Sequence, residues 1–273
     1  MISIDYVVRG SDILIKRKDF SLDQTLDCGQ AFRWERLDNS SDCCYHGFYL
    51  NNSLNVSEEK DYIVLHNTSE DSFNNIWFSY FDLDTDYSEL KKMFSEDETL
   101  AKACEYAHGI RLLKQDKWEA LCSFIISQNN NIPRIKGIIS RLCVQYGGFP
   151  TPVQLSGVKA DDLAFLRAGF RAKYLEDCIE KINAGIIDLE KTILMPIGDA
   201  RKELMTIKGV GPKVAECALL YGMYRIEAFP IDVWIKRVME KYYPDGFPKY
   251  LSQYAGIAQQ YLFHYIRTGV KDQ

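Results

Sequence analysis

Apolar and polar residues alternate in short segments over the first 66 residues of the chain. These segments are rich in β-branched and aromatic residues and are separated by Asn, Asp, Ser and Gly, which is typical of strands joined by turns. They read DILIKRK, QAFRWERL, CCYHGFYL, SLNVS and DYIVLHN. The separators are too short to hold crossover helices, so the pattern predicts an antiparallel sheet.

The period of the pattern changes near Asp71. Apolar residues then recur at spacings of three and four, as in a helix, first in SFNNIWFSYF and YSELKKMF and almost throughout after residue 96. Glycine or proline separates the later segments, which read KWEALCSFIIS, NIPRIKGIISRLCVQYG, KYLEDCIEKINAG, DARKELMTI, KVAECALLYGM, VWIKRVMEKYY and YLSQYAGIAQQYLFHYI. We therefore predict an α+β protein, with an antiparallel β-rich domain and flanking helices at residues 1–95 and an all-helical domain at residues 96–273.

The net charge of −5 is unevenly distributed along the chain. Residues 1–95 hold 9 Lys and Arg against 17 Asp and Glu, a net of −8, whereas residues 96–273 hold 24 against 21, a net of +3. This weak charge argues against a broad basic face. A phosphate-binding surface is therefore expected to be local and to lie in the second part.

Composition restricts the class of protein. The 273 residues are 47% apolar and 26% charged, as in a globular protein. No run approaches the 18 or so apolar residues that a membrane helix needs, and the first 20 residues lack the pattern of a signal peptide. We expect an intracellular protein with no membrane partner, cytoplasmic in a bacterium and nuclear in a eukaryote.

The eight cysteines include no CxxC pair. In an intracellular chain of this length they are expected to be reduced thiols. The adjacent Cys43 and Cys44 would point to opposite faces of a strand, so we expect them to fill space rather than to bind a metal.

Residues 204–220, LMTIKGVGPKVAECALL, contain an unusually placed lysine. Gly209, Gly211 and Pro212 break the chain and start a helix, because proline suits the first helical position. Lys213 then lies in the first turn, where the helix dipole disfavours a cation by about 0.3–1 kcal/mol. Two helices joined by such a glycine turn present main-chain N–H groups to an anion such as a DNA phosphate. A plain helix–helix turn is the alternative. The glycine spacing fits neither the Walker nor the Rossmann pattern.

A second charged residue follows in AFPIDVWIKRV, where Pro230 precedes Asp232 at the head of another predicted helix. A carboxylate is favoured there as a helix cap, which explains Asp232 on structural grounds alone. A glycine hairpin with a lysine at the head of its second helix, followed by Pro-x-Asp, resembles the helix-hairpin-helix Gly/Pro-Asp superfamily of DNA base-excision glycosylases.

Four other stretches narrow the resemblance. DCGQAFRW (27–34), FIISQNNNIPRIKGIISRLC (124–143), AGFRAKY (168–174) and YAGIAQQYLF (254–263) are similar to segments of 8-oxoguanine DNA glycosylase. With the hairpin, they extend over both predicted domains. The four-cysteine iron–sulfur loop of related endonuclease-type members is missing, since the last cysteine is Cys217.

The resemblance implies that Lys213 is the nucleophile and Asp232 the essential acidic residue. A dipole that disfavours the ammonium would help the neutral amine that must attack the anomeric carbon of a deoxyribose and form a Schiff base. The carboxylate would stabilise the positive charge that develops on the sugar.

The resemblance also assigns the pocket for the extruded base. The Gly29 carbonyl would accept from the N7 hydrogen that oxidised guanine has and guanine lacks. Gln259 would hydrogen-bond to the base edge, with Phe263 stacked on one face of the base and Cys217 on the other. The alternatives are an ordinary turn glycine at Gly29 and a core residue at Phe263.

Four residues are implied on the opposite strand. Asn129 would fill the gap left by the extruded base, Arg134 and Arg171 would contact the opposite cytosine, and Phe170 would wedge the stack, which offsets the few kcal/mol that flipping costs. A helix cap at Asn129 and solvated arginines are the alternatives.

Phosphate contacts are implied for Gly209, Gly211 and Val214 in the hairpin and for Trp234. The family commonly has a histidine where this chain has Trp234, and a carboxylate where it has Ile266. An indole N–H can still donate to a phosphate.

We therefore expect a bifunctional glycosylase that removes 8-oxoguanine from duplex DNA and nicks the abasic strand by β-elimination. It would act as a monomer, with no cofactor and no metal. One alternative is an alkylated-base glycosylase of the same fold, which works with the aspartate alone. The other is a non-catalytic helix-hairpin-helix module that binds only the DNA backbone and needs neither Lys213 nor the Gly29 segment.

Overall fold

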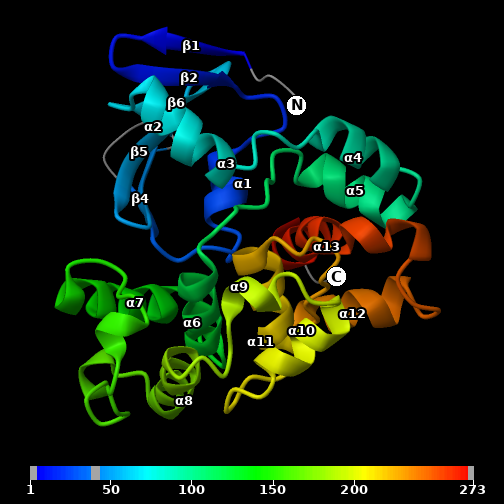
Figure 1. The fold of residues 1–273 in the computed structure, drawn as a ribbon. Helices are drawn as coiled ribbons and strands as arrows, with labels where there is room; N and C mark the ends of the chain where they lie inside the picture. Colours follow the sequence, from blue (N-terminus) through cyan, green and yellow to red (C-terminus); the bar gives the residue numbers. More distant parts are fainter. Residues whose placement is uncertain (1–4, 38–43, 270–273) are drawn as a thin grey trace. The chain divides into compact units, whose positions relative to one another are not determined.

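The computed structural model describes residues 5–37 and 44–269. By its internal contacts the chain divides into two compact units, one of Met1–Lys114 with Ile231–Gln273 and one of Gln115–Pro230 (Figure 1). The first unit therefore contains both the N-terminal sheet and the last helices, and the second is a continuous insertion between them.

The first unit contains the predicted antiparallel sheet. Its strands are β1 (Tyr6–Arg9), β2 (Asp12–Lys16), β3 (Trp34–Arg36), β4 (Cys44–Tyr49), β5 (Asn52–Glu58) and β6 (Tyr62–His66). They lie in the order β1-β2-β6-β5-β4-β3, and every neighbouring pair is antiparallel. The prediction of an antiparallel sheet is confirmed, with β1 as a strand beyond the predicted segments. Cys43 of the Cys43–Cys44 pair lies outside the described residues.

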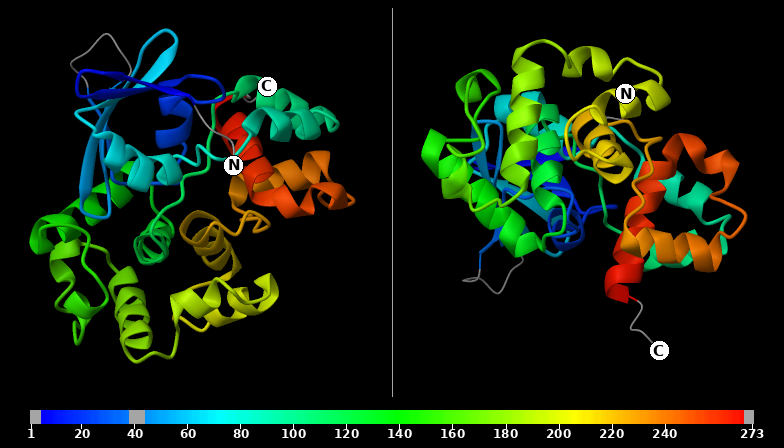
Figure 2. Two further views of the ribbon diagram at one scale, coloured as in Figure 1. Left: turned by 45° about the horizontal axis from the view of Figure 1, so that its top comes forward. Right: turned by 90° about the horizontal axis from the view of Figure 1, so that it is seen from below.

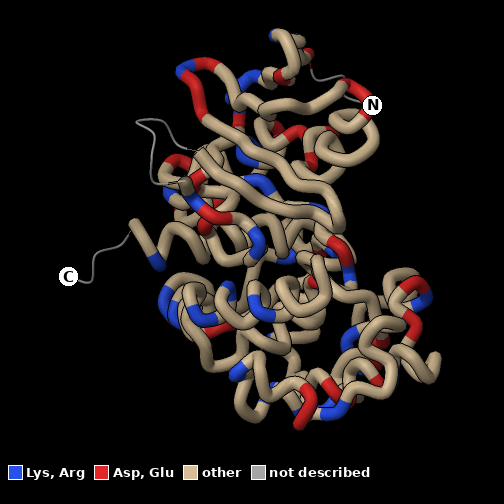
Figure 3. Tube along the Cα trace, turned by 90° about the vertical axis from the view of Figure 1, so that its left-hand side faces the viewer, with Lys and Arg blue, Asp and Glu red and all other residues tan. Residues whose placement is uncertain are grey.

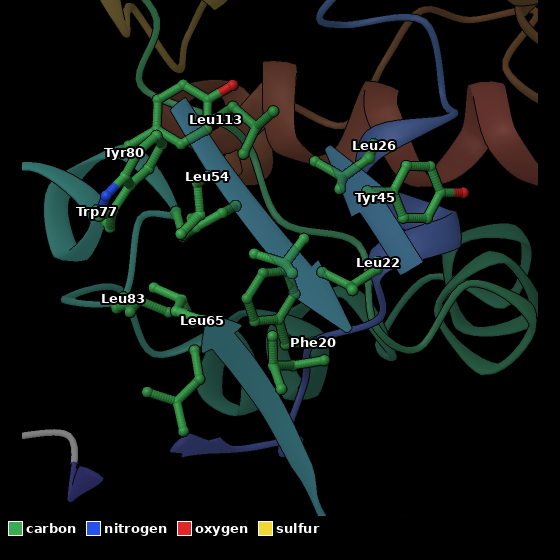
Figure 4. Packing of buried hydrophobic residues seen from close by; sticks show 14 of the residues in the cluster. Phe20, Leu22, Leu26, Tyr45, Leu54, Leu65, Trp77, Tyr80, Leu83 and Leu113 are labelled. Carbon is green, nitrogen blue, oxygen red and sulfur yellow. The ribbon is translucent and has the colours of Figure 1, made fainter. Parts of the chain in front are cut away.

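One face of the sheet carries the core of this unit. Ile13 of β2 pairs with Leu65 of β6, and both are buried. Apolar residues of the segment 70–83 pack on the same core, including Trp77 and Tyr80, as Figure 4 shows. Leu14 and Val64, which alternate with these core residues, are buried as well, so the central strands β2 and β6 are covered on both faces.

β3 and β4 fix the segment that precedes β3. Trp34 pairs with Gly47, and a Cβ atom on Gly47 would come within 2.2 Å of the Trp34 ring. The indole Nε1 of Trp34 donates to the Tyr80 hydroxyl over 2.7 Å. Because the strand leaves room for Trp34 only at a glycine, residues 27–34 are anchored firmly at their C-terminal end.

Helices complete the first unit. They are α1 (Leu22–Leu26), α2 (Glu70–Ser72), the π-helical η1 (Phe73–Trp77), α3 (Phe78–Tyr80), α4 (Tyr87–Phe94), α5 (Glu98–Tyr106), α12 (Val233–Tyr242), the 3-10 helix η5 (Lys249–Tyr254), α13 (Ala255–His264) and the π-helical η6 (Tyr265–Gly269). Helix α13 packs on α5 and α12 (Figure 1). Packing between α5 and α13 joins parts of the chain that are about 150 residues apart.

The second unit is helical. It contains α6 (Lys117–Ser127), α7 (Ile132–Tyr146), the 3-10 helices η2 (Val153–Leu155) and η3 (Ala164–Leu166), α8 (Arg171–Asn183), α9 (Leu189–Thr192), α10 (Ile197–Leu204), α11 (Pro212–Cys217) and the π-helical η4 (Ala218–Gly222). Every residue of α6 from 120 to 126 is buried, and this helix contacts α7, α8, α11 and η4 (Figure 2). The predicted helical segments of this part of the chain are confirmed.

Candidate active site

The predicted hairpin is formed by α10, α11 and the turn between them. Gly209 in the turn has φ +76°, and a Cβ atom there would come within 2.3 Å of the Tyr174 ring. Only glycine satisfies both conditions. Pro212 is the first residue of α11, and no side chain caps the amides of that first turn. Gly211 and Val214 lie at the same turn, with the Val214 side chain buried.

Helix α8 holds this turn in place. The Lys208 amide donates to the Asp177 carboxylate over 2.7 Å, and Asp177 also pairs with Lys181 over 2.9 Å. The Lys181 ammonium donates in turn to the Thr206 carbonyl. The hairpin is therefore a supported turn with an uncapped helix start, an arrangement that leaves amides available for an anion.

Lys213 is the second residue of α11 and is half-buried. Its Nζ atom lies 5.4 Å from the centre of the Phe124 ring, which itself stacks on Tyr221 with the ring centres 5.0 Å apart. Among the described residues of its own unit, Lys213 has no ion-pair partner. The amine is therefore placed by an aromatic surface and by the helix start, rather than neutralised by a carboxylate.

Asp232 caps α12, as its place in the sequence predicts. A single carboxylate oxygen, Oδ1, accepts from the amides of Trp234 (3.0 Å) and Ile235 (2.8 Å). These bonds fix the side chain and occupy one oxygen. The cap thus accounts for the rotamer of Asp232 and leaves the second oxygen able to face a developing positive charge.

The three asparagines after α6 have separate structural roles. Asn129 is exposed with φ +50°, Asn130 donates to the Ile126 carbonyl over 2.8 Å, and Asn131 caps α7 by accepting from the Arg134 amide over 3.0 Å. The helix cap proposed as an alternative for Asn129 is therefore made by Asn131. Asn129 projects from a constrained loop without a capping role.

Arg171 supports that loop. Its guanidinium donates to the carbonyls of Gln128 (2.7 Å from Nε), Asn129 (3.0 Å) and Ala168 (3.0 Å), and the residue is 3% exposed. Burial, followed by the nearby charge of Arg134, lowers the pKa of Arg171. The alternative of a solvated arginine does not hold for Arg171.

Two further opposite-strand candidates are accessible. Phe170 is 48% exposed, with the Arg171 guanidinium 4.4 Å from its ring centre. Arg134 at the start of α7 is also exposed. The second unit thus brings an exposed asparagine, an exposed aromatic ring and an exposed arginine to the same region as the buried Arg171.

Gly29 lies between two buried residues of the first unit and has φ +85°. The Cys28 thiol donates to the Thr25 carbonyl over 3.2 Å and lies beside the side chains of Gln30 and Gln260, and burial raises its pKa to about 11. The Gln30 amide group donates to the carbonyls of Thr25 (2.9 Å) and Arg111 (2.8 Å). The peptide at Gly29 is therefore fixed from both sides.

Helix α13 carries the other base-pocket candidates of this unit. Gln259 is 3% exposed, and Phe263 is half-buried with the Arg267 guanidinium 5.7 Å from its ring centre. The contact between Cys28 and Gln260 brings the Gly29 segment to this helix. Cys217 is buried at the end of α11 in the other unit.

Trp234, at the position where the family often has histidine, is half-buried on α12. The Arg237 guanidinium lies 5.0 Å from its ring centre, which gives the indole a charged neighbour. Ile266 lies in η6 and brings no carboxylate. Acidic and basic residues are interspersed along the backbone trace drawn in Figure 3.

Three residues of the site have roles that the motifs do not reveal. Gln30 holds the peptide of Gly29, Arg237 contacts Trp234, and the buried Glu216 pairs with Arg201. Glu216 has a signal in the sequence, since it is the one charge in the apolar run VAECALLYG.

Over residues 5–37 and 44–269, no group of three or more His, Cys, Asp and Glu side chains is arranged to hold a metal ion. In the same described ranges, no helix is both long and apolar enough to cross a membrane.

Comparison with known proteins identifies the family. Residues 12–121 match the model for the 8-oxoguanine DNA glycosylase N-terminal domain, and residues 122–249 match that for the HhH-GPD superfamily of base excision DNA repair proteins. The N-glycosylase/DNA lyase of Saccharomyces cerevisiae is 30% identical, over 85% of this chain and 70% of that protein.

Two solved structures resemble the whole chain. MBOgg1 in complex with a low affinity DNA ligand has a TM-score of 0.90 at 38% identity, covering 99% of this chain and 100% of that one. The Clostridium acetobutylicum 8-oxoguanine glycosylase/lyase, in complex with duplex DNA containing cytosine opposite 8-oxoG, has a TM-score of 0.88 at 36% identity, covering 98% and 99%. The chain with the Lys213 hairpin and the Asp232 cap therefore belongs to the 8-oxoguanine DNA glycosylase family of the HhH-GPD superfamily.

Proposed function

We propose that this protein removes 8-oxoguanine from duplex DNA through a covalent lysine intermediate and then cleaves the abasic strand by β-elimination. The observation that carries the proposal is the Lys213 amine at the start of α11, without an ion-pair partner among the described residues of its unit and next to the Phe124 ring. A backbone-binding module needs no such amine, and a glycosylase that works with an aspartate alone needs none either.

The chemistry follows from the side chains of Lys213 and Asp232. The neutral Lys213 amine attacks C1′ of the deoxyribose, the bond from C1′ to N9 breaks, and the base leaves with the electron pair and takes up a proton. Opening of the sugar gives a Schiff base between Nζ and C1′. Loss of a 2′ proton then breaks the bond to the 3′ phosphate oxygen. Asp232 stabilises the positive charge on the sugar, and its two amide hydrogen bonds hold it for that task.

We assign the reading of the lesion to Gly29, Gln259 and Phe263 of the first unit and to Cys217 of the second. The fixed peptide of Gly29 gives its carbonyl one orientation, which suits an acceptor for the N7 hydrogen of 8-oxoguanine. Guanine presents an acceptor at N7, so two acceptors would face each other and the unmodified base would lose a hydrogen bond.

The opposite strand is contacted by Asn129, Phe170 and Arg134. Asn129 fills the gap, Phe170 wedges the stack, and Arg134 donates to the O2 and N3 acceptors of the opposite cytosine. In view of its buried hydrogen bonds, we assign Arg171 to the support of the Asn129 loop as well as to this surface.

The phosphates are held by the amides near Gly209, Gly211 and Val214 and by the Trp234 indole. No metal or cofactor takes part in this scheme. The protein acts as a monomer on DNA, in the cytoplasm of a bacterium or the nucleus of a eukaryote. We keep residues 1–95 and 96–273 as its two proposed domains.

Borohydride reduction during turnover tests the covalent step. Wild type should be trapped on a duplex with 8-oxoguanine opposite cytosine, with the adduct mapped to Lys213. Lys213→Gln should bind the lesion duplex but release no base. Lys208→Gln is the matched control, because this exposed lysine lies in the same hairpin and should still be trapped.

Asp232→Asn tests the second residue. It should lower the single-turnover excision rate by about 10²–10³, the usual loss for one electrostatic contact to a transition state. Base release by Lys213→Gln at near wild-type rate would overturn the proposal and favour the aspartate-only glycosylase.

A further inference from the structure

Glu216 is a buried carboxylate on the helix of the nucleophile. It lies three residues after Lys213 on α11 and is 6% exposed. An ionised carboxylate is costly in such a place unless it is paired and hydrogen-bonded. Its neighbours in the sequence are apolar, so the charge needs an explanation.

Both carboxylate oxygens have partners. Oε1 accepts from the Arg201 guanidinium of α10 in an ion pair. Oε2 accepts from the Phe229 amide over 2.8 Å. Glu216 therefore joins the two helices of the hairpin to the segment that leaves the second unit.

That segment is also fixed at its beginning. The Arg225 amide donates to the Leu219 carbonyl over 2.9 Å, and the Arg225 guanidinium donates to the carbonyls of Ile193 (3.0 Å) and Met195 (2.7 Å). Residues 225–229 are thus attached at both ends. The hydrogen bond from the Phe229 amide to Glu216 holds the C-terminal end of this segment.

The chain runs from this attachment directly to Asp232. Phe229 precedes it by three residues, which span at most about 10 Å. Pro230 is buried and has a fixed φ, so Ile231 is the one intervening residue with ordinary backbone freedom. The bond from Phe229 to Glu216 thus fixes the chain three residues before Asp232.

We propose that Glu216 is a positioning residue, which fixes Phe229 and thereby sets where the chain leaves the Lys213 unit on its way to Asp232. The inference rests on the proposed function. Glu216 touches neither substrate nor reacting atoms in this scheme. Its contribution to excision is made through Asp232.

A double-mutant cycle with Asp232→Asn tests this inference. Glu216→Met keeps a similar side-chain volume but removes the carboxylate, and with it the bonds to Arg201 and Phe229. It should slow single-turnover excision about 10–100-fold, because small misplacements of reacting groups cost that much. Glu216→Asp retracts the carboxylate but keeps its charge and should cost about 10-fold. In the Asp232→Asn background, neither change should slow excision further.

Arg201→Gln separates the two partners of Glu216. It removes the ion pair and leaves the Phe229 bond, so it should slow excision less than Glu216→Asp. All rates are measured below the unfolding midpoint of each variant. If Glu216→Met does not fold, Glu216→Asp alone completes the cycle.

Equal losses with and without the Asp232 carboxylate would overturn the inference, as would a wild-type rate for Glu216→Asp. Failure of the proposed function gives a different result. In that case wild type is not trapped by borohydride at Lys213, whatever residue stands at position 216.

Discussion

The Nζ atom of Lys213 lies over the face of the Phe124 ring, 5.4 Å from the ring centre. An aromatic face attracts a cation, whereas the start of α11 disfavours one. The amine is thus held between two opposing influences, without a carboxylate from its own unit among the described residues. Phe124 is 3% exposed and belongs to the central helix α6, so the surface below the amine is rigid.

Phe124→Leu should leave the fold intact but remove the aromatic ring that positions the Lys213 amine. The substitution keeps an apolar side chain and should cost about 1–2 kcal/mol of unfolding free energy, as is usual for a core change. The single-turnover excision rate should fall about 10–100-fold because Nζ loses its platform. Urea unfolding and excision are measured on the same sample. A rate unchanged from wild type would show that Phe124 has no part in placing the amine.

Gly209→Ala should destabilise the hairpin. Its φ of +76° strains any other residue, and the added Cβ would overlap the Tyr174 ring. We expect a loss of about 1–3 kcal/mol. Gly211→Ala is the matched control, since Gly211 has φ −97° and nothing lies within 4 Å of its added Cβ. That variant should lose less than about 1 kcal/mol in thermal unfolding. Equal losses at the two glycines would contradict the proposed steric cause.

Local pattern was sufficient to predict the hairpin and the cap. Pro212 after two glycines starts α11, and Asp232 caps α12, because both depend on neighbours a few residues away. The same holds for the antiparallel sheet, whose strands are joined by short turns. The packing of α13 on α5 has no local signal, since it joins distant parts of the chain.

The support of the site was harder to predict than the site itself. Arg171 matched the family motif as a reader of cytosine, but its hydrogen bonds to Gln128 and Asn129 depend on how α6 and α8 pack. Asn131 takes the capping role that was the alternative for Asn129, because α7 begins at Ile132, two residues later than a cap at Asn129 would require. The burial of Arg171 and its bonds to distant carbonyls produce no periodic pattern in the sequence, so the sequence alone does not predict them.

Arg134→Ala should change the selectivity for the opposite base, whereas Arg171→Ala should mainly reduce stability. Arg134 is exposed, so its loss should leave unfolding free energy within about 0.5 kcal/mol and narrow the rate difference between 8-oxoguanine opposite cytosine and opposite adenine. Arg171→Ala removes the donor to the carbonyls of Gln128, Asn129 and Ala168 and should cost about 2–4 kcal/mol. Its rates should fall by one common factor for both opposite bases. If Arg134→Ala produced the common factor, Arg134 would be a general DNA contact.

The buried thiol beside Gly29 predicts an alkaline limit to stability. Burial raises the pKa of Cys28 to about 11 from an ordinary value of 9.0. The folded state therefore keeps the proton more tightly than the unfolded chain. The resulting stabilisation is complete below pH 9 and is lost as the pH rises to about 11. The difference between a pKa of 9.0 and one of about 11 corresponds to about 3 kcal/mol of unfolding free energy.

Cys28→Ser removes this titration, because a hydroxyl keeps its proton throughout the range and can still donate to the Thr25 carbonyl, as the thiol does over 3.2 Å. Urea unfolding from pH 7 to 11 should show a steeper loss of stability above pH 9 for wild type than for the variant. The difference isolates Cys28 from the tyrosines and lysines that titrate in both proteins. Since Cys28 adjoins Gly29, excision by wild type should also lose discrimination against guanine in this window before the global transition. Parallel stability curves for the two proteins from pH 9 to 11 would mean that folding does not raise the pKa of Cys28.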